Sequence, residues 1–169
     1  IIQNDTVGAA QGTFYDLVDS AQIVEFTGWV YEFNTTTELV LITAPQPIPV
    51  EIIETRPTRP APIELELSDL FTPSGGYNFD AEKYEGMLVT FRNVVTSDRN
   101  TNGNFKINDF NGHSAFIYNQ SRYFKTGAVG IIPGYQPPLN GSYLEYLTGI
   151  VTTRTDGYYI VPVYPGDVG

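Results

Sequence analysis

The segment from Met87 to Thr96 constrains the fold of this chain more than any other part of its sequence. It reads Met-Leu-Val-Thr-Phe-Arg-Asn-Val-Val-Thr, and most of these residues are of the β-branched and aromatic types that strands favour. Polar segments at 74–76 and 98–104 lie on either side, and the preceding Gly86 suits a sharp bend or the close passage of another strand. The sequence therefore predicts a long, curled strand, which is typical of the first strand of a small closed barrel.

Composition extends this expectation to the whole chain. Of its 169 residues, 16 are Gly, 12 are Pro and 12 are Tyr. Gly and Pro interrupt helices, whereas Tyr and the β-branched residues favour a pleated sheet. No part of the sequence repeats apolar residues at sustained i, i+3, i+4 spacing. The predicted fold class is therefore all-β.

Turn residues divide the predicted strands into hairpins. A polar turn at 34–37 separates an N-terminal pair, and Asn-Gly dipeptides at 102–103 and 111–112 separate three strands of a meander, because Asn-Gly tolerates the positive φ values of tight turns. A turn at 155–157 closes a last hairpin. The predicted strands are Ile23–Tyr31, Glu38–Thr43, Val50–Ile53, Ile63–Leu67, Met87–Thr96, Phe105–Asp109, Ser114–Tyr118, Tyr143–Thr153 and Tyr158–Val163.

A proline-rich segment at 56–62 is the best candidate for a linker, because its prolines hold the chain in extended conformations. It predicts an N-terminal partial module with linker at 1–62 and a barrel module at 63–169. The sequence from Glu25 to Val30 is echoed from Tyr146 to Val151, with Thr-Gly at the same place in each. Both copies continue into a polar turn, a second strand and a proline-containing exit, which indicates an internal repeat.

Charge and cysteine content limit the functions that we expect. The formal net charge is −10, which argues against general binding of nucleic acids because their phosphates would be repelled. There is no Cys, and no apolar run is long enough to span a membrane. The chain begins at Ile1 rather than Met, which indicates either that a leader was removed or that a longer product was cut. Of these we expect the removal of a secretory leader, and therefore secretion.

The run from Val24 to Val95 resembles the tandem OB-fold-like modules of secreted bacterial proteins, including those found beside extracellular endonuclease domains. The matching pieces are Thr27–Asn34, the proline-rich segment, Ile63–Leu70 and Glu82–Phe91. The resemblance implies an OB-like five-stranded Greek-key barrel at 63–169. It also implies that 21–54 are the last strands of an incomplete module, a hairpin with open edges. No catalytic nuclease domain accompanies these modules, so the resemblance implies no enzymatic role.

The turn that follows the central strand has the spacing of a calcium loop. Asp98, Asn100 and Asn102 occupy its first, third and fifth places, Gly103 its sixth and Asp109 its twelfth. Asn104 adds a further side-chain oxygen. Against calcium, a Glu is usual at the twelfth place, and a plain hairpin turn explains Asn-Gly equally well. Both interpretations stay open: a hairpin turn, or a calcium site formed by Asp98, Asn100, Asn102, Asn104 and Asp109.

Aromatic residues supply the candidate ligand-binding site. OB barrels bind on the face of their second and third strands, which in this chain span 105–118. Tyrosines can stack against bases or sugars, and Arg122 and Lys125 lie next to an aromatic pair. Packing in a core or interface is the alternative use of these rings. The candidate ligand-binding residues are Phe105, Tyr118, Arg122, Tyr123 and Lys125.

Nothing in the sequence predicts catalysis. His113 is the only His, and it lies in a turn where we expect it at the surface without a Ser and Asp to complete a triad. Glu64 and Glu66 alternate along a predicted strand, which places both on its solvated face. The sequence predicts that the protein is not an enzyme.

Two hypotheses for the function follow. In the first, the protein is a secreted structural protein whose copies exchange strands and polymerise into an extracellular filament, tube or surface layer, because an incomplete module leaves sheet edges that recruit strands. In the alternative, it is an accessory OB module of a larger secreted protein that binds single-stranded nucleic acid or polysaccharide.

Overall fold

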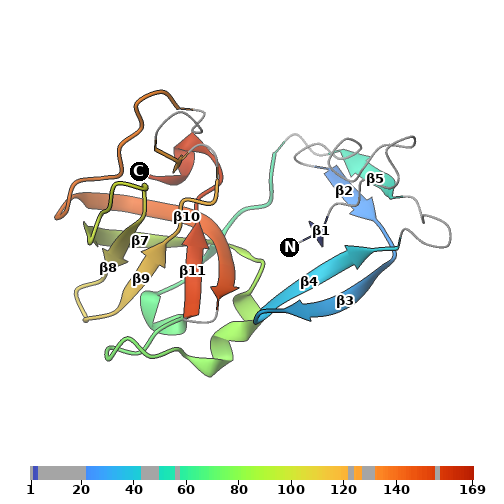
Figure 1. Cartoon of the computed structure of the whole chain (residues 1–169), viewed down its shortest axis with the longest axis horizontal. Helices are drawn as coiled ribbons and strands as arrows, with labels where there is room; N and C mark the ends of the chain where they lie inside the picture. Colours follow the sequence, from blue (N-terminus) through green and yellow to red (C-terminus); the bar gives the residue numbers. More distant parts are fainter. Residues whose placement is uncertain are drawn as a thin grey trace. The chain divides into compact units, whose positions relative to one another are not determined.

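The structure is a computed structural model that describes residues 2–3, 22–42, 50–55, 58–121, 124–126, 132–154 and 157–169. The chain divides into two compact units, Ile1–Ala61 and Pro62–Gly169. The division falls within the proline-rich segment. Strands make up most of the regular structure in both units (Figure 1), so the all-β fold class is confirmed.

The second unit contains a closed five-stranded barrel with OB-like Greek-key topology, as predicted. Its strands follow one another around the barrel in the order β7, β8, β9, β11, β10 and back to β7. All neighbours are antiparallel except β9 and β11, whose arrows point the same way in Figure 1. The strands are β7 (Leu88–Ser97), β8 (Phe105–Asn108), β9 (Ser114–Ile117), β10 (Tyr143–Arg154) and β11 (Gly157–Val161).

The long strand β7 curls as the sequence predicts. Its inward side chains are Val89 and Phe91 in the first half but Val94 and Thr96 in the second, so the alternation changes phase in the middle. Asn93 lies at that point with a φ of 54°. The left-handed backbone conformation of Asn93 bends the strand. The bend lets β7 pair with β10 along most of its length and with β8 at its end.

Short segments cover the two strand edges that barrel closure leaves exposed. On the first half of β7, β6 (Ile63–Glu64) pairs in parallel opposite Val89 and Thr90. On the first half of β10, the C-terminal residues take the same role: Val168 bridges Leu147, and the N–H of Gly169 donates to the carbonyl of Tyr146 at 3.1 Å. The backbone groups at these two edges therefore bond to segments of the same chain, which blocks edge-to-edge association with another chain there.

Two 3-10 helices, η2 (Leu67–Asp69) and η3 (Phe79–Tyr84), connect β6 to β7 and pack on the barrel core. A third, η6 (Pro165–Asp167), precedes the C-terminus. None of the helical segments among the described residues has the length and apolar character needed to cross a membrane. The core is one cluster of buried side chains: Leu65, Leu67, Leu70, Phe71, Ala81, Val89, Phe91, Val94, Phe105, Ile107, Ala115, Ile117, Leu144, Leu147, Val151, Tyr158 and Ile160.

The first unit contains a hairpin and a separate strand pair. The predicted strand Ile23–Tyr31 is divided in two, because its first half pairs with β5 and its second half with β4. The hairpin turn is Asn34-Thr35, both with positive φ, and is shorter than the predicted turn at 34–37. A two-residue β1 pairs in parallel with β4. The strands are β1 (Ile2–Gln3), β2 (Gln22–Glu25), β3 (Gly28–Phe33), β4 (Thr36–Leu41) and β5 (Glu51–Thr55).

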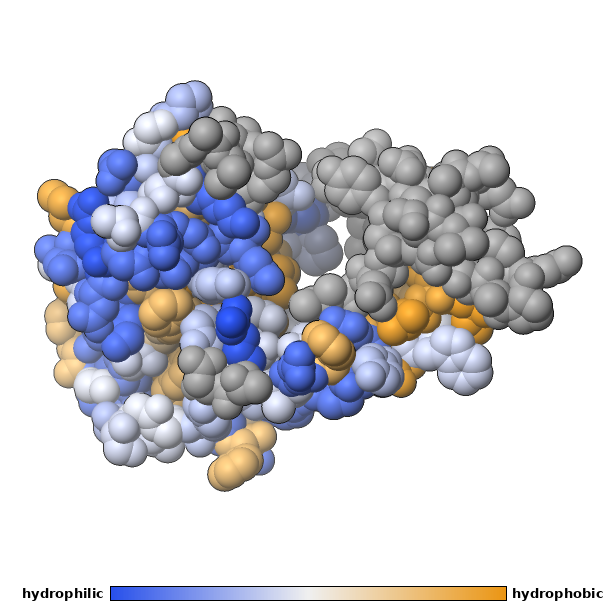
Figure 2. All heavy atoms as spheres, viewed as in Figure 1, coloured by the Kyte–Doolittle hydropathy of each residue, from blue (hydrophilic) through white to orange (hydrophobic). Residues whose placement is uncertain are grey.

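Strand β3 has an open edge, since no strand among the described residues pairs with the side of it that faces away from β4. Apolar and aromatic side chains are exposed on both of its faces. Trp29 is 66% exposed and its neighbour Val30 is 75% exposed, although consecutive residues of a strand point to opposite faces. Figure 2 shows hydrophobic residues at the surface along this hairpin.

Candidate ligand-binding face

Alternation along β8 and β9 decides which side chains a ligand can reach. Inward residues alternate with outward residues in both strands. In the pairing of the two strands, Lys106 lies opposite Phe116, and both side chains are on the outer surface. The inward residues of both strands belong to the core: Phe105, Ile107, Ala115 and Ile117.

Three aromatic rings meet on the outer surface of β9 and β11. The ring of Phe116 contacts that of Tyr159 edge-to-face, with centroids 4.9 Å apart and planes at 73°. These two residues lie opposite each other where β9 and β11 pair in parallel. Tyr118, just after β9, contacts Tyr159 in the same way, at 5.8 Å and 68°. The parallel pairing therefore brings together rings that are about forty residues apart in sequence.

A cation completes this cluster. Arg154, the last residue of β10, holds its guanidinium carbon 4.8 Å from the ring centroid of Tyr118 and 5.7 Å from that of Tyr159. In such contacts the negative face of an aromatic ring attracts the cation. Phe116, Tyr118, Tyr159 and Arg154 form what we call the aromatic face.

The predicted ligand-binding residues are placed very differently. Tyr118 belongs to the aromatic face. Phe105 is 1% exposed in the core, so its ring is not available to a ligand. Lys125 is half-buried in the loop between β9 and β10. Arg122 and Tyr123 lie outside the described residues.

Sequence reasoning missed Phe116 and Arg154, whereas Tyr159 was one of the tyrosines considered for stacking but was not selected as a candidate. One signal for the first was present. In a strand that alternates, the inward Ala115 and Ile117 place Phe116 on the opposite face. No local signal could find Arg154 or single out Tyr159 among the tyrosines, because both join the face only through pairing between distant strands.

Three of the proposed calcium ligands, Asn100, Asn104 and Asp98, already bond to other groups of the chain through their side-chain oxygens. The Oδ1 atom of Asn100 accepts the backbone N–H groups of Asn102 at 2.9 Å and Asn104 at 3.2 Å. Asn104 in turn accepts the backbone N–H of Asn119 at 2.9 Å. Asp98 forms an ion pair with Lys106 at 2.9 Å. The Asn100 bonds are those of a hairpin turn, and a bound cation would have to replace several of these contacts.

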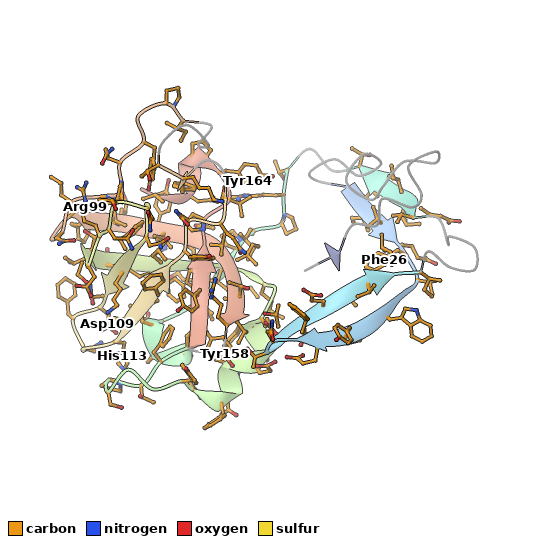
Figure 3. The ribbon with its side chains drawn as sticks, in the orientation of Figure 1. Phe26, Arg99, Asp109, His113, Tyr158 and Tyr164 are labelled. Carbon is orange, nitrogen blue, oxygen red and sulfur yellow. The ribbon has the colours of Figure 1, made fainter. Side chains whose placement is uncertain are left out.

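The fifth predicted calcium ligand, Asp109, holds the next turn instead (Figure 3). Its Oδ1 atom accepts the backbone N–H groups of Asn111 and His113, both at 2.8 Å, and its Oδ2 atom lies 2.7 Å from Nδ1 of His113. Burial favours a higher pKa for Asp109, but these hydrogen bonds outweigh it and hold the pKa below its usual value. The His113 side chain is only 12% exposed, so the prediction of a surface position was wrong.

Across the part of the chain that the structure describes, no three or more His, Cys, Asp or Glu side chains gather as a metal site would require. Calcium binding therefore stays a prediction that rests on the spacing of the loop. Glu64 and Glu66 are both exposed, as predicted, and Glu64 forms an ion pair with Arg92 at 2.8 Å.

The hydroxyl of Tyr158, whose pKa is strongly raised, serves packing. Burial, together with the hydrogen bond to Glu82 at 3.1 Å, raises the pKa of Tyr158 to about 12. Its ring contacts Phe71 and Tyr77 edge-to-face from within the core. The hydroxyl therefore stays protonated at neutral pH and anchors β11 to η3.

No family model, curated protein or solved structure matches this chain. The function therefore has to be argued from the residues of the aromatic face and from the topology that positions them.

Proposed function

We propose that the C-terminal barrel is a non-catalytic module that binds an extended glycan on its aromatic face. The observation that carries this proposal is the cluster of Phe116, Tyr118 and Tyr159 on the outer surface of β9 and β11. OB barrels bind oligosaccharides and oligonucleotides over their second and third strands. In this barrel these strands are β8 and β9, so the rings lie on or beside the surface that such barrels use.

Charge favours a glycan over single-stranded nucleic acid. Barrels that hold single strands combine stacking rings with a positively charged groove that follows the phosphates. This chain has a net charge of −10, and the one lysine on β8 is neutralised by Asp98. A mostly neutral sugar chain needs no such groove, because aromatic rings can pack against the apolar faces of its sugars.

Affinity electrophoresis of the purified chain through gels containing soluble polysaccharides tests this proposal. We expect retardation by at least one glycan and none by oligo-dT. Tyr118→Ala should lower the affinity about fivefold, corresponding to ~1 kcal/mol for one lost ring contact. The control is Phe110→Ala, which removes an 80% exposed ring at the turn between β8 and β9, outside the aromatic face. Binding that both variants keep, or a preference for oligo-dT, would contradict the proposal.

A second candidate function, self-assembly into an extracellular polymer, is favoured by the open edge of β3. An exposed, apolar strand edge recruits other strands. In addition, β1 pairs with β4 over only two residues, Ile2 and Gln3. The same pairing formed between copies would link them head to tail and produce an open chain of subunits.

Light scattering of the purified chain over a range of concentrations tests assembly. Deletion of residues 1–20 should leave monomers if β1 is the exchanged segment. Val30→Lys should also weaken assembly, because a charge on an edge strand opposes pairing. Phe79→Lys is the control, since Phe79 is exposed on the other unit. A wild-type chain that stays monomeric at high concentration would exclude this function.

A further inference from the structure

Arg154 is held in place by the rings of the aromatic face. Its guanidinium lies over Tyr118 and near Tyr159, at the end of β10 where the chain turns into β11. A long side chain normally loses much rotamer freedom when it binds a ligand. Contacts with two rings remove part of that freedom in advance, so Arg154 is partly preorganised for a ligand.

The charge of Arg154 has no acidic partner among the described residues, although the chain is strongly acidic. Two other exposed cations of the barrel are neutralised: Arg92 pairs with Glu64 and Lys106 with Asp98. Within the described ranges the side-chain contacts of Arg154 are those with the two rings, which leave its N–H donors without a carboxylate there. A guanidinium in this state matches a carboxylate, which it can bind through two parallel hydrogen bonds.

We propose that the glycan carries a uronic acid and that Arg154 binds its carboxylate while the neighbouring rings pack against the sugar. This inference rests on the proposed glycan-binding function and adds the class of sugar. The aromatic face has one unneutralised cation rather than a row of them. It therefore suits a ligand whose acidic groups are isolated along a largely neutral surface, and not a polyphosphate chain, which carries a charge on every unit.

The experiment compares acidic oligosaccharides with matched neutral forms. Oligogalacturonate, oligoalginate and hyaluronan oligomers are each titrated into the full chain by calorimetry, alongside their methyl esters, which keep the sugar rings but remove the charge. We expect wild type to bind at least one acidic form about tenfold more tightly than its ester. Arg154→Gln should abolish this preference and bind both forms with the affinity of the ester. Arg154→Lys should restore part of it, since Lys keeps the charge without the planar pair of donors.

Arg92→Gln is the matched control, because it removes an exposed arginine outside the aromatic face and should leave the preference intact. An acid preference that survives in Arg154→Gln, or equal binding of acid and ester by wild type, would overturn the inference while glycan binding stands. If no acid or ester binds but a neutral polysaccharide does, the inference fails and the proposed glycan-binding function stands. If no glycan of any kind binds, the proposed function fails together with it.

Discussion

Replacing Gly149 with Ala tests the closure of the barrel most directly. Gly149 lies where β10 passes from pairing with β7 to pairing with β11. A Cβ atom there would lie 2.8 Å from the backbone carbon and oxygen of Val161 and 2.7 Å from Cγ2 of Ile160. Real Cβ contacts are essentially never shorter than 3.0 Å, and the backbone of a barrel strand cannot move aside as a flexible side chain can. β10 and β11 would have to separate.

The size of the effect follows from two opposing terms. Forcing an extra carbon into a packed site costs about 1–3 kcal/mol, and a clash with backbone belongs at the upper end, ~3 kcal/mol. Ala also lowers the conformational entropy of the unfolded chain, which stabilises the folded state by up to about 1 kcal/mol. We expect Gly149→Ala to lower the free energy of unfolding by about 2 kcal/mol. For a unit of this size that corresponds to a fall in melting temperature of about 8–16 °C.

Near-UV circular dichroism of the tyrosines follows unfolding of the barrel, and fluorescence of the single tryptophan, Trp29, follows the other unit. The control is Gly166→Ala, because nothing lies within 4 Å of a Cβ at that position. We expect that variant to melt within about 2 °C of wild type. If Gly149→Ala also melted within this range, β10 and β11 could not approach each other as the structure describes, and the reasoning about closure would be refuted.

Three further predictions concern titrating groups and calcium. The pKa of Tyr158 rises from 10 to about 12 on folding, so the stabilisation that its hydroxyl gives should be complete below pH 10 and disappear as the pH rises towards 12. In urea denaturation, the midpoint of Tyr158→Phe should therefore fall less over this pH range than that of wild type. The pKa of Asp109 is lowered on folding, so its contribution should be present above the ordinary carboxyl pKa of about 4 and be lost as the pH falls through the folded value. Asp109→Asn should therefore cost about 1 kcal/mol at pH 7 and show a weaker loss of stability in acid, by the same measurement. Calcium in excess of a chelator should leave the melting temperature unchanged, because Asn100, Asn104 and Asp98 already bond to other groups of the chain. A rise of several degrees would show that the loop binds the ion.

The two Thr-Gly pairs of the predicted repeat show what could be inferred from the sequence. Gly28 and Gly149 occupy matching places in the suspected repeat, and both are crowded in the structure. A Cβ atom at Gly28 would lie 2.8 Å from the carbonyl oxygen of Val40, just as one at Gly149 would meet that of Val161. The sequence pointed to these positions, but only the fold shows why they need glycine: a neighbouring strand passes too close for a side chain.

The ligand-binding face shows where sequence reasoning stopped. Tyr118 was found from the sequence because it ends a predicted strand on the binding face of an OB-like barrel. Phe105 was also selected, yet it is buried, because a shift of one residue along a strand exchanges the inner and outer faces. Sequence alone gave no register for that strand, so it could not decide between Phe105 and its neighbour Lys106.

Local chemistry in the sequence was sufficient to determine the all-β class, the curled strand β7 and most of the hairpins, since strand preference and turn residues act over a few neighbouring positions. The five-stranded barrel was expected from the resemblance to OB-fold-like modules. Tertiary structure alone decided that β9 and β11 pair in parallel and that Phe116, Tyr159 and Arg154 meet. These contacts join residues far apart along the chain, and their geometry depends on the closure of the whole barrel rather than on any local preference.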